Sequence, residues 1–124
     1  MLTDSELILK LQDLVARERD LVAEVLRHLR EVEQRGLYLT RGHSSMFAFC
    51  TEGLGYSEAE AYIRIQAMRL MRAVPTLEQK IESGEISLSV AAKAQSCFRR
   101  ENVSVERKSE IVEQLSCCLK SWPT

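Results

Sequence analysis

Residues 44–74 read SSMFAFCTEGLGYSEAEAYIRIQAMRLMRAV. A short apolar segment, a Gly-Tyr turn and a longer amphipathic segment follow one another, which is the layout of a helix-turn-helix unit. Ser57 and Glu60 form an S-x-x-E capping box, so we expect the longer helix to begin at Ser57. No acidic residue occurs between Ala61 and Leu77, whereas three arginines do: Arg64, Arg69 and Arg72. The pattern predicts a helix that presents positive charge.

The two faces of this longer helix follow from steps of about 100° per residue. We expect one face to pack on the core, and it comprises Ala59, Ile63, Gln66, Leu70, Ala73 and Val74. We expect the opposite face to meet solvent, and it comprises Ser57, Ala61, Arg64, Met68 and Arg72, with Arg69 on the flank. The shorter helix before it should plug the core with Met46, Phe47, Phe49 and Cys50.

Upstream of this unit, an apolar stripe predicts one long helix over residues 5–34, capped near Thr3, with a further turn to about residue 40. The stripe comprises Leu7, Leu11, Leu14, Leu21, Val25 and Val32. Thirty helical residues span about 45 Å, which is longer than a compact domain of this size is wide. The helix should therefore bend or protrude. Glu18 and His28 interrupt the stripe, which suggests a break or an exposed portion near residues 17–20.

A protruding stripe carries more apolar surface than one small domain can cover. We therefore expect a homodimer whose contacts comprise Leu7, Leu11, Leu14, Leu21 and Val25. Two-fold pairing would also allow two recognition helices to reach successive major-groove turns, about 34 Å apart.

Downstream, Pro75 and Gly84 bound a short helix that Thr76 is expected to cap, Ser87 or Ser89 begins the next helix, and Ser104 the last. We find no alternating segment that requires a strand. The expected fold is a single all-α domain over residues 1–124, a bundle of about six helices. It comprises the long N-terminal helix (5–40), the helix-turn-helix-like unit (44–74) and the C-terminal helices (76–121).

The charge balance argues against a global attraction to polyanions. Of the 124 residues, 45% are hydrophobic and 28% are charged, and the net charge is −1. Any binding to nucleic acid must then be local. The N-terminus, MLTDSELILK, has acids where a signal peptide places basic residues, and no uncharged run approaches the ~18 residues of a membrane span. We expect a cytoplasmic protein without membrane contact.

The sequence offers no catalytic or metal-binding pattern. The four cysteines are irregularly spaced, and we expect reduced thiols: Cys50, Cys97, Cys117 and Cys118. Neither Cys-x-x-Cys nor His-x3-His spacing occurs, so no metal or other cofactor is expected. Cys50 is close to His43 in sequence, but its apolar turn should raise the thiol pKa. We expect no enzyme activity and no small-molecule substrate.

Four motifs resemble the N-terminal helical region of bacterial HNH endonuclease-like proteins, over roughly residues 3–115. They are EVEQRGLY (31–38), GHSSMFAFC (42–50), LGYSEAEAYIRIQA (54–67) and GEISLS (84–89). In that family a separate HNH nuclease domain follows the helical region and binds a metal that activates water. Neither His28 nor His43 lies in a His-Asn…His context, so the resemblance implies a helical targeting module without nuclease activity in this chain.

The leading interpretation is a non-catalytic module that binds duplex DNA through local positive charge. Its expected contact residues are Arg41, His43, Ser57, Arg64, Arg69 and Arg72. Glu58 and Glu60 in the first turn of the longer helix count against it, and Glu60 is also a possible partner for Arg64 at i−4. We expect Tyr56 and Tyr62 to pack in the core or at a cap. The alternative is a helical self-association or protein-interaction module without DNA binding.

Overall fold

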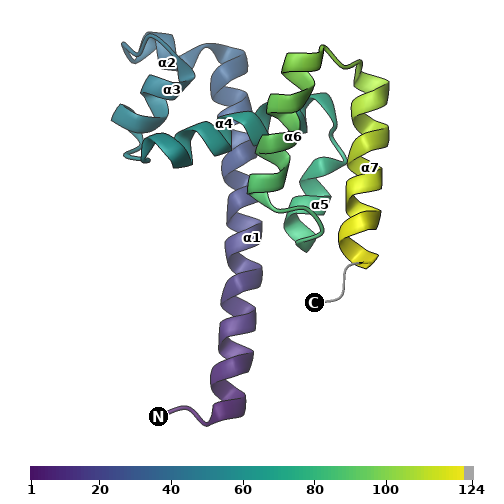
Figure 1. Ribbon diagram of the computed structural model, residues 1–124. Helices are drawn as coiled ribbons and strands as arrows, with labels where there is room; N and C mark the ends of the chain where they lie inside the picture. Colours follow the sequence, from purple (N-terminus) through teal and green to yellow (C-terminus); the bar gives the residue numbers. More distant parts are fainter. Residues whose placement is uncertain (122–124) are drawn as a thin grey trace.

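The computed structural model describes the backbone of residues 1–121 and the side chains of residues 1–115. Within that range every secondary-structure element is a helix, as predicted (Figure 1). The elements are α1 (Asp4–Arg35), α2 (Leu37–Thr40), α3 (Met46–Ala48), the π-helix η1 (Phe49–Gly53), α4 (Glu58–Ala73), α5 (Leu77–Ser83), α6 (Leu88–Glu101) and α7 (Val105–Ser121). The tail after residue 121 and the side chains of Cys117 and Cys118 lie outside the described residues.

Helix α1 runs without a break through residues 17–20, where a break or an exposed portion was expected, and these four residues are exposed. It opens with a capping box, in which the Glu6 backbone N–H donates to the Thr3 hydroxyl and the Thr3 N–H donates to the Glu6 carboxylate. Gly36 ends it in the left-handed conformation, with φ of 64°. Because that residue breaks the helix, the further turn expected to about residue 40 forms the separate helix α2.

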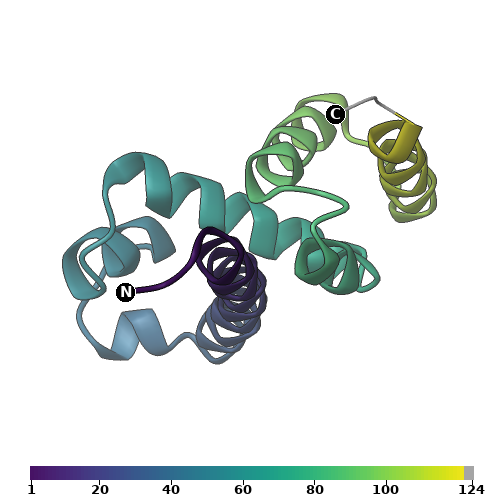
Figure 2. The same ribbon diagram turned by 90° about the horizontal axis from the view of Figure 1, so that it is seen from below.

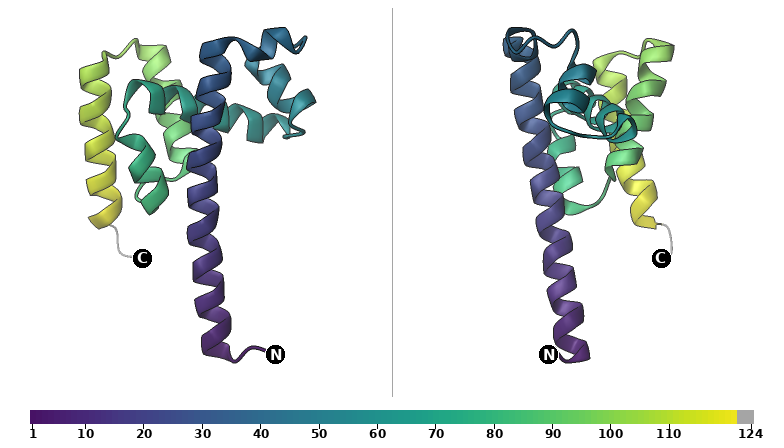
Figure 3. Two further views of the ribbon diagram at one scale, coloured as in Figure 1. Left: turned by 180° about the vertical axis from the view of Figure 1, so that it is seen from behind. Right: turned by 90° about the vertical axis from the view of Figure 1, so that its left-hand side faces the viewer.

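Only the C-terminal half of α1 touches the rest of the molecule, and the N-terminal half extends well beyond it (Figures 1 and 3). The buried residues of α1 are Ala23, Leu26 and Leu29. Arg27 binds Glu78 and Glu82 of α5, and these carboxylates raise the pKa of its guanidinium. The guanidinium of Arg19 lies so close to Gly84 that a Cβ there would meet its carbon at 2.6 Å. These contacts mark where α1 leaves the domain.

Helix α4 is the centre of the fold, with α1 across one side and α6 against another (Figure 2). The expectation of one core face and one solvent face is therefore wrong. Ala61 and Met68 were expected outside and are fully buried, whereas Ala59 was expected inside and is exposed. A helix covered from several directions buries residues all round, so a single apolar face does not describe it. Its buried residues are Ala61, Ile65, Gln66, Ala67, Met68, Leu70 and Met71.

Serine side chains cap the starts of α3, α6 and α7, whereas the cap expected at Thr76 is absent and the expected core plug is only partly buried. Ser45 caps α3, Ser87 caps α6, and the Ser104 hydroxyl accepts a hydrogen bond from Arg107 at the start of α7. Thr76 makes no side-chain cap at α5, because its backbone is already helical. The core plug is partial: Met46 and Cys50 are buried, but Phe47 is 40% exposed.

Candidate interaction surfaces

Two of the arginines expected to contact DNA are held by a carboxylate of α1. Arg69 donates to one Glu33 oxygen at 3.0 Å and Arg72 donates to the other at 3.0 Å. The Glu33 side chain is only 13% exposed. Charge-assisted hydrogen bonds of this kind are among the stronger polar contacts in proteins. Arg69 and Arg72 thus fasten α4 to α1, and the single carboxylate of Glu33 offsets one of their two positive charges.

Arg64 is also engaged, and its partner is Glu60 as its spacing predicted, although through the backbone oxygen rather than through a salt bridge with the carboxylate. Its guanidinium lies 4.5 Å from the centre of the Tyr56 ring and donates to the backbone oxygen of Glu60. The Glu60 carboxylate instead accepts from the Ser57 N–H, and the Ser57 hydroxyl caps α4. Hydrogen bonds from the Ser57 backbone and side chain lower the pKa of the Glu60 carboxyl.

Two other residues expected to contact DNA are not part of the group of Glu33, Arg69 and Arg72, which we call the Glu33 cluster: His43 packs against η1, and Arg41 follows helix α2. The side chain of His43 is 18% exposed, packs edge-on against Phe49 and lies 3.3 Å from a Glu52 oxygen. Arg41 is exposed and has no ion-pair partner among the described residues. Five of the six residues expected to contact DNA thus have structural partners on α1, η1 or α4 itself.

The largest exposed apolar surface is on α1. Every residue from Asp4 to Arg17 is exposed except Val15, which is half-buried, and we call this part the projecting segment. The dimer residues expected from sequence include four exposed leucines, at 43% to 60% of their surface: Leu7, Leu11, Leu14 and Leu21. They lie opposite Ala23 and Leu26, which face the domain. We call the line from Leu7 to Val32 on this open side the outer seam.

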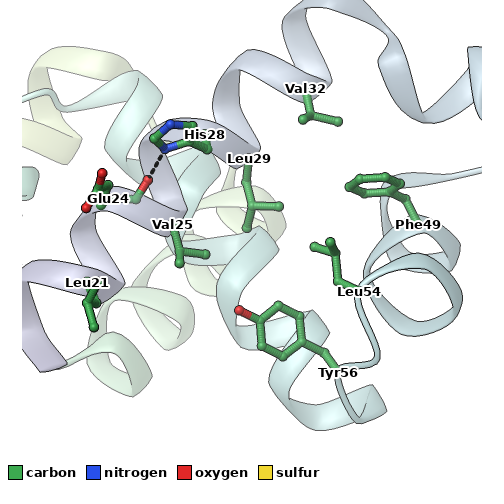
Figure 4. A pocket seen from close by; sticks show the side chains of 9 residues that line it. All are labelled: Leu21, Glu24, Val25, His28, Leu29, Val32, Phe49, Leu54 and Tyr56. Carbon is green, nitrogen blue, oxygen red and sulfur yellow. Dashed lines mark hydrogen bonds between the residues drawn. The ribbon is translucent and has the colours of Figure 1, made fainter.

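The outer seam enters an apolar groove, the α1 groove, which has a volume of about 630 Å³ (Figure 4). Helix α1 forms one wall with Leu21, Glu24, Val25, His28, Leu29 and Val32. The other wall is formed by Phe49, Leu54 and Tyr56 (Figure 4). His28 is exposed, and its Nδ1 lies 2.7 Å from the backbone oxygen of Glu24. The exposed leucines and this groove form one continuous surface because both lie on the same side of α1.

A second surface, between α4 and α6, is cationic. Tyr62 is 47% exposed rather than packed in the core, and its hydroxyl forms a 2.6 Å hydrogen bond with that of Ser96. Around this pair lie Lys93, Arg99 and Arg100, which line two adjoining depressions of about 460 and 590 Å³. These three cations are exposed and have no carboxylate partner among the described residues. We call this region the cationic hollow.

Sequence reasoning missed both the Glu33 cluster and the cationic hollow. A signal for the first was present: neither Arg69 nor Arg72 has an acidic residue within four positions, so a carboxylate partner had to come from another element. The cationic hollow has a weaker signal in the sequence KAQSCFRR (93–100), whose cations recur at helical spacing. Its closeness to Tyr62 depends on the packing of α6 against α4.

Three further features bear on function. Burial raises the pKa of the Cys50 thiol, as its apolar turn predicted, although Arg64 opposes this. Among the described residues, Cys50 and Cys97 are free thiols and no cluster of His, Cys, Asp or Glu has a metal-binding arrangement. No helix in the described part of the chain is both long and apolar enough to cross a membrane.

Comparison with models of protein families, with curated proteins and with solved structures finds no match. The resemblance to HNH endonuclease-like proteins therefore stays a prediction from four motifs.

Proposed function

We propose that this chain is a non-catalytic helical interaction module that self-associates through the outer seam of α1. The observation that carries the proposal is the projecting segment: fourteen residues of helix with exposed leucines and no packing against the domain. A helix of that length is marginal in water by itself. Burying a leucine contributes roughly 1.5–3 kcal/mol, so a partner along the outer seam would stabilise the segment.

Self-association can be tested with one seam variant and one matched variant. Leu11 is on the outer seam, whereas Leu9 is also exposed but points to another side of the same turn. We expect Leu11→Lys to lower the association constant by at least tenfold and Leu9→Lys to change it little, because only the first places a charge in the interface. Analytical ultracentrifugation from low to high micromolar protein measures this. A wild-type chain that stays monomeric, or equal effects of both variants, would contradict the proposal.

A second candidate function, binding of duplex DNA, is favoured by the cationic hollow rather than by the arginines of α4. Unpaired Lys93, Arg99 and Arg100 can contact phosphates, whereas Arg69 and Arg72 already bind Glu33. Labelled duplex titrated at low and moderate salt should bind with an affinity that falls as salt rises. Changing the three hollow cations to alanine should abolish that binding, and changing Arg64 and Arg41 should alter it little. The reverse ranking, or no salt dependence, would exclude this surface.

A further inference from the structure

The outer seam follows the seven-residue repeat of a coiled coil over its whole length. Counting Leu7 as position d places Leu14, Leu21 and His28 at d as well, and Leu11, Glu18, Val25 and Val32 at a. Positions b, e and f of the C-terminal half face the domain, where Ala23, Leu26 and Leu29 are buried. The a and d positions from residue 7 to residue 32 are exposed except Val25 and Val32, which are half-buried against the core, so this side of α1 is largely open to another helix.

A parallel pair of α1 helices would be poorly matched. Like positions face each other in a parallel pair, so Glu18 would meet Glu18 in the middle of the interface. The g positions, Lys10, Arg17 and Glu24, would lie beside e positions that carry apolar Val15, Val22 and Leu29 and so offer no opposite charge. Both domains would also lie at the same end of the pair, since each is attached to the C-terminal half of its α1 (Figure 1).

An antiparallel pair relieves these conflicts in one register, in which Glu18 lies opposite Leu21 instead of a second Glu18. With Leu14 opposite Val25 of the second copy, Leu11 lies opposite His28 and Leu7 opposite Val32. The flanking g positions then place Arg17 beside Glu24 and Lys10 beside Glu31. These are two opposite-charge pairs, and each occurs twice by symmetry.

The two neighbouring antiparallel registers are less favourable because they bring like charges together. A shift of one heptad one way places Arg17 beside its own symmetry copy, and a shift the other way does the same to Glu24. The shift that pairs Glu24 with itself also leaves Leu7 beyond the partner's seam. Like charges in direct contact disfavour both alternatives.

We propose that two copies of the chain pair through α1 in this antiparallel register, so that the projecting segment of each occupies the α1 groove of the other. The proposal rests on the self-association proposed above and names its geometry. Leu7, Leu11 and Leu14 of one copy fill the space between α1 and the wall of Phe49, Leu54 and Tyr56 in the second. The two domains then lie at opposite ends of the helix pair.

Charge reversal tests the register. Arg17→Glu and Glu24→Arg should each weaken the dimer about fivefold, since each places like charges together twice. The variant that carries both changes should return to within about twofold of the wild-type dissociation constant. Arg17 also binds Asp13 within α1 at 2.9 Å, but Glu24→Arg cannot restore that contact, so recovery reports the pair between copies. Asp20→Arg, away from the seam, is the control and should have a smaller effect.

Oxidative cross-linking provides a second readout. The variant with both Leu14→Cys and Val25→Cys should give a disulfide-linked dimer, whereas Leu14→Cys alone should not exceed the background of the native thiols. A dimer in which Leu14→Cys links to itself, or in which the charge-reversed pair shows no recovery, overturns the register and leaves self-association standing. A wild-type chain that never dimerises overturns both.

Discussion

The projecting segment of α1 and helix α4 begin with the same local signals but lie in opposite environments, the first in solvent and the second in the core. Each helix opens with a capping box, Thr3 with Glu6 in α1 and Ser57 with Glu60 in α4, and each carries apolar residues at helical spacing. Yet α4 buries seven of its residues, and the projecting segment buries none. Local signals thus set where a helix starts, whereas burial depends on which other elements reach it.

The difference comes from what each helix meets. Helix α4 is crossed by α1 and covered by α6, and the core between the helices includes the small side chains of Ala61, Ala67 and Ala91. The projecting segment meets nothing within its own chain, although its leucines are larger than those alanines. An exposed apolar helix face and a buried one therefore cannot be told apart by composition.

The largest expected effect on stability distinguishes the buried helix α4 from the exposed projecting segment. Met68→Ala in α4 removes a fully buried side chain and should lower the free energy of unfolding by roughly 2–5 kcal/mol. Leu11→Ala in the projecting segment should change it by less than about 0.5 kcal/mol in dilute, monomeric protein, because Leu11 is already in water. Urea denaturation followed by circular dichroism compares them. Equal losses would show that the projecting segment packs on the domain after all.

An intermediate effect is expected where the two helices are joined. Glu33→Gln removes the charge that both Arg69 and Arg72 bind and should cost about 1–2 kcal/mol, allowing for the partial exposure of the arginines. In dilute, monomeric protein Glu31→Gln is the matched control two residues away, since Glu31 is exposed and within its own chain pairs with Arg35 one turn along α1. Thermal unfolding of both variants measures the difference. Similar melting temperatures would mean that the Glu33 cluster contributes little.

The smallest effect should come from the two capping boxes. Ser57→Ala should lower the free energy of unfolding by about 1 kcal/mol, because α4 unfolds with the core. Thr3→Ala should only fray the end of α1, which is visible as faster amide hydrogen exchange there, and should leave global stability unchanged. Equal losses of global stability would contradict this distinction.

The stability that the capping box of Ser57 and Glu60 contributes depends on pH. The pKa of the Glu60 carboxyl is lowered in the folded chain, so its contribution to stability is present above the ordinary value of 4.5 and is lost as the pH falls through the lowered value. The loss caused by Ser57→Ala should therefore shrink below about pH 4.5. Urea titrations at neutral and acidic pH measure it, and a constant loss would mean that the carboxylate does not contribute.

Most of the fold could be predicted from local sequence signals, and most of the expected site could not. The S-x-x-E box at Ser57, Gly36 and Gly84 at helix ends, and the stripe from Leu7 all act over a few residues and all appear in the structure. The arginines of α4 were assigned to solvent because their partner Glu33 is more than thirty positions away. A contact between residues that far apart in the chain leaves no periodic pattern in the sequence.

The sequence by itself determined that this chain is all-α, where its principal helices begin and end, and that the long first helix carries an apolar stripe. Capping, helix-ending glycines and 3.6-residue periodicity each act over a few neighbouring residues, so they can be recognised in the amino-acid sequence alone. Only the tertiary structure decided that α4 lies at the centre, that Glu33 holds Arg69 and Arg72, and that the stripe passes from open solvent into the α1 groove. Those outcomes depend on which helices meet, because burial and ion pairing are properties of contacts between elements.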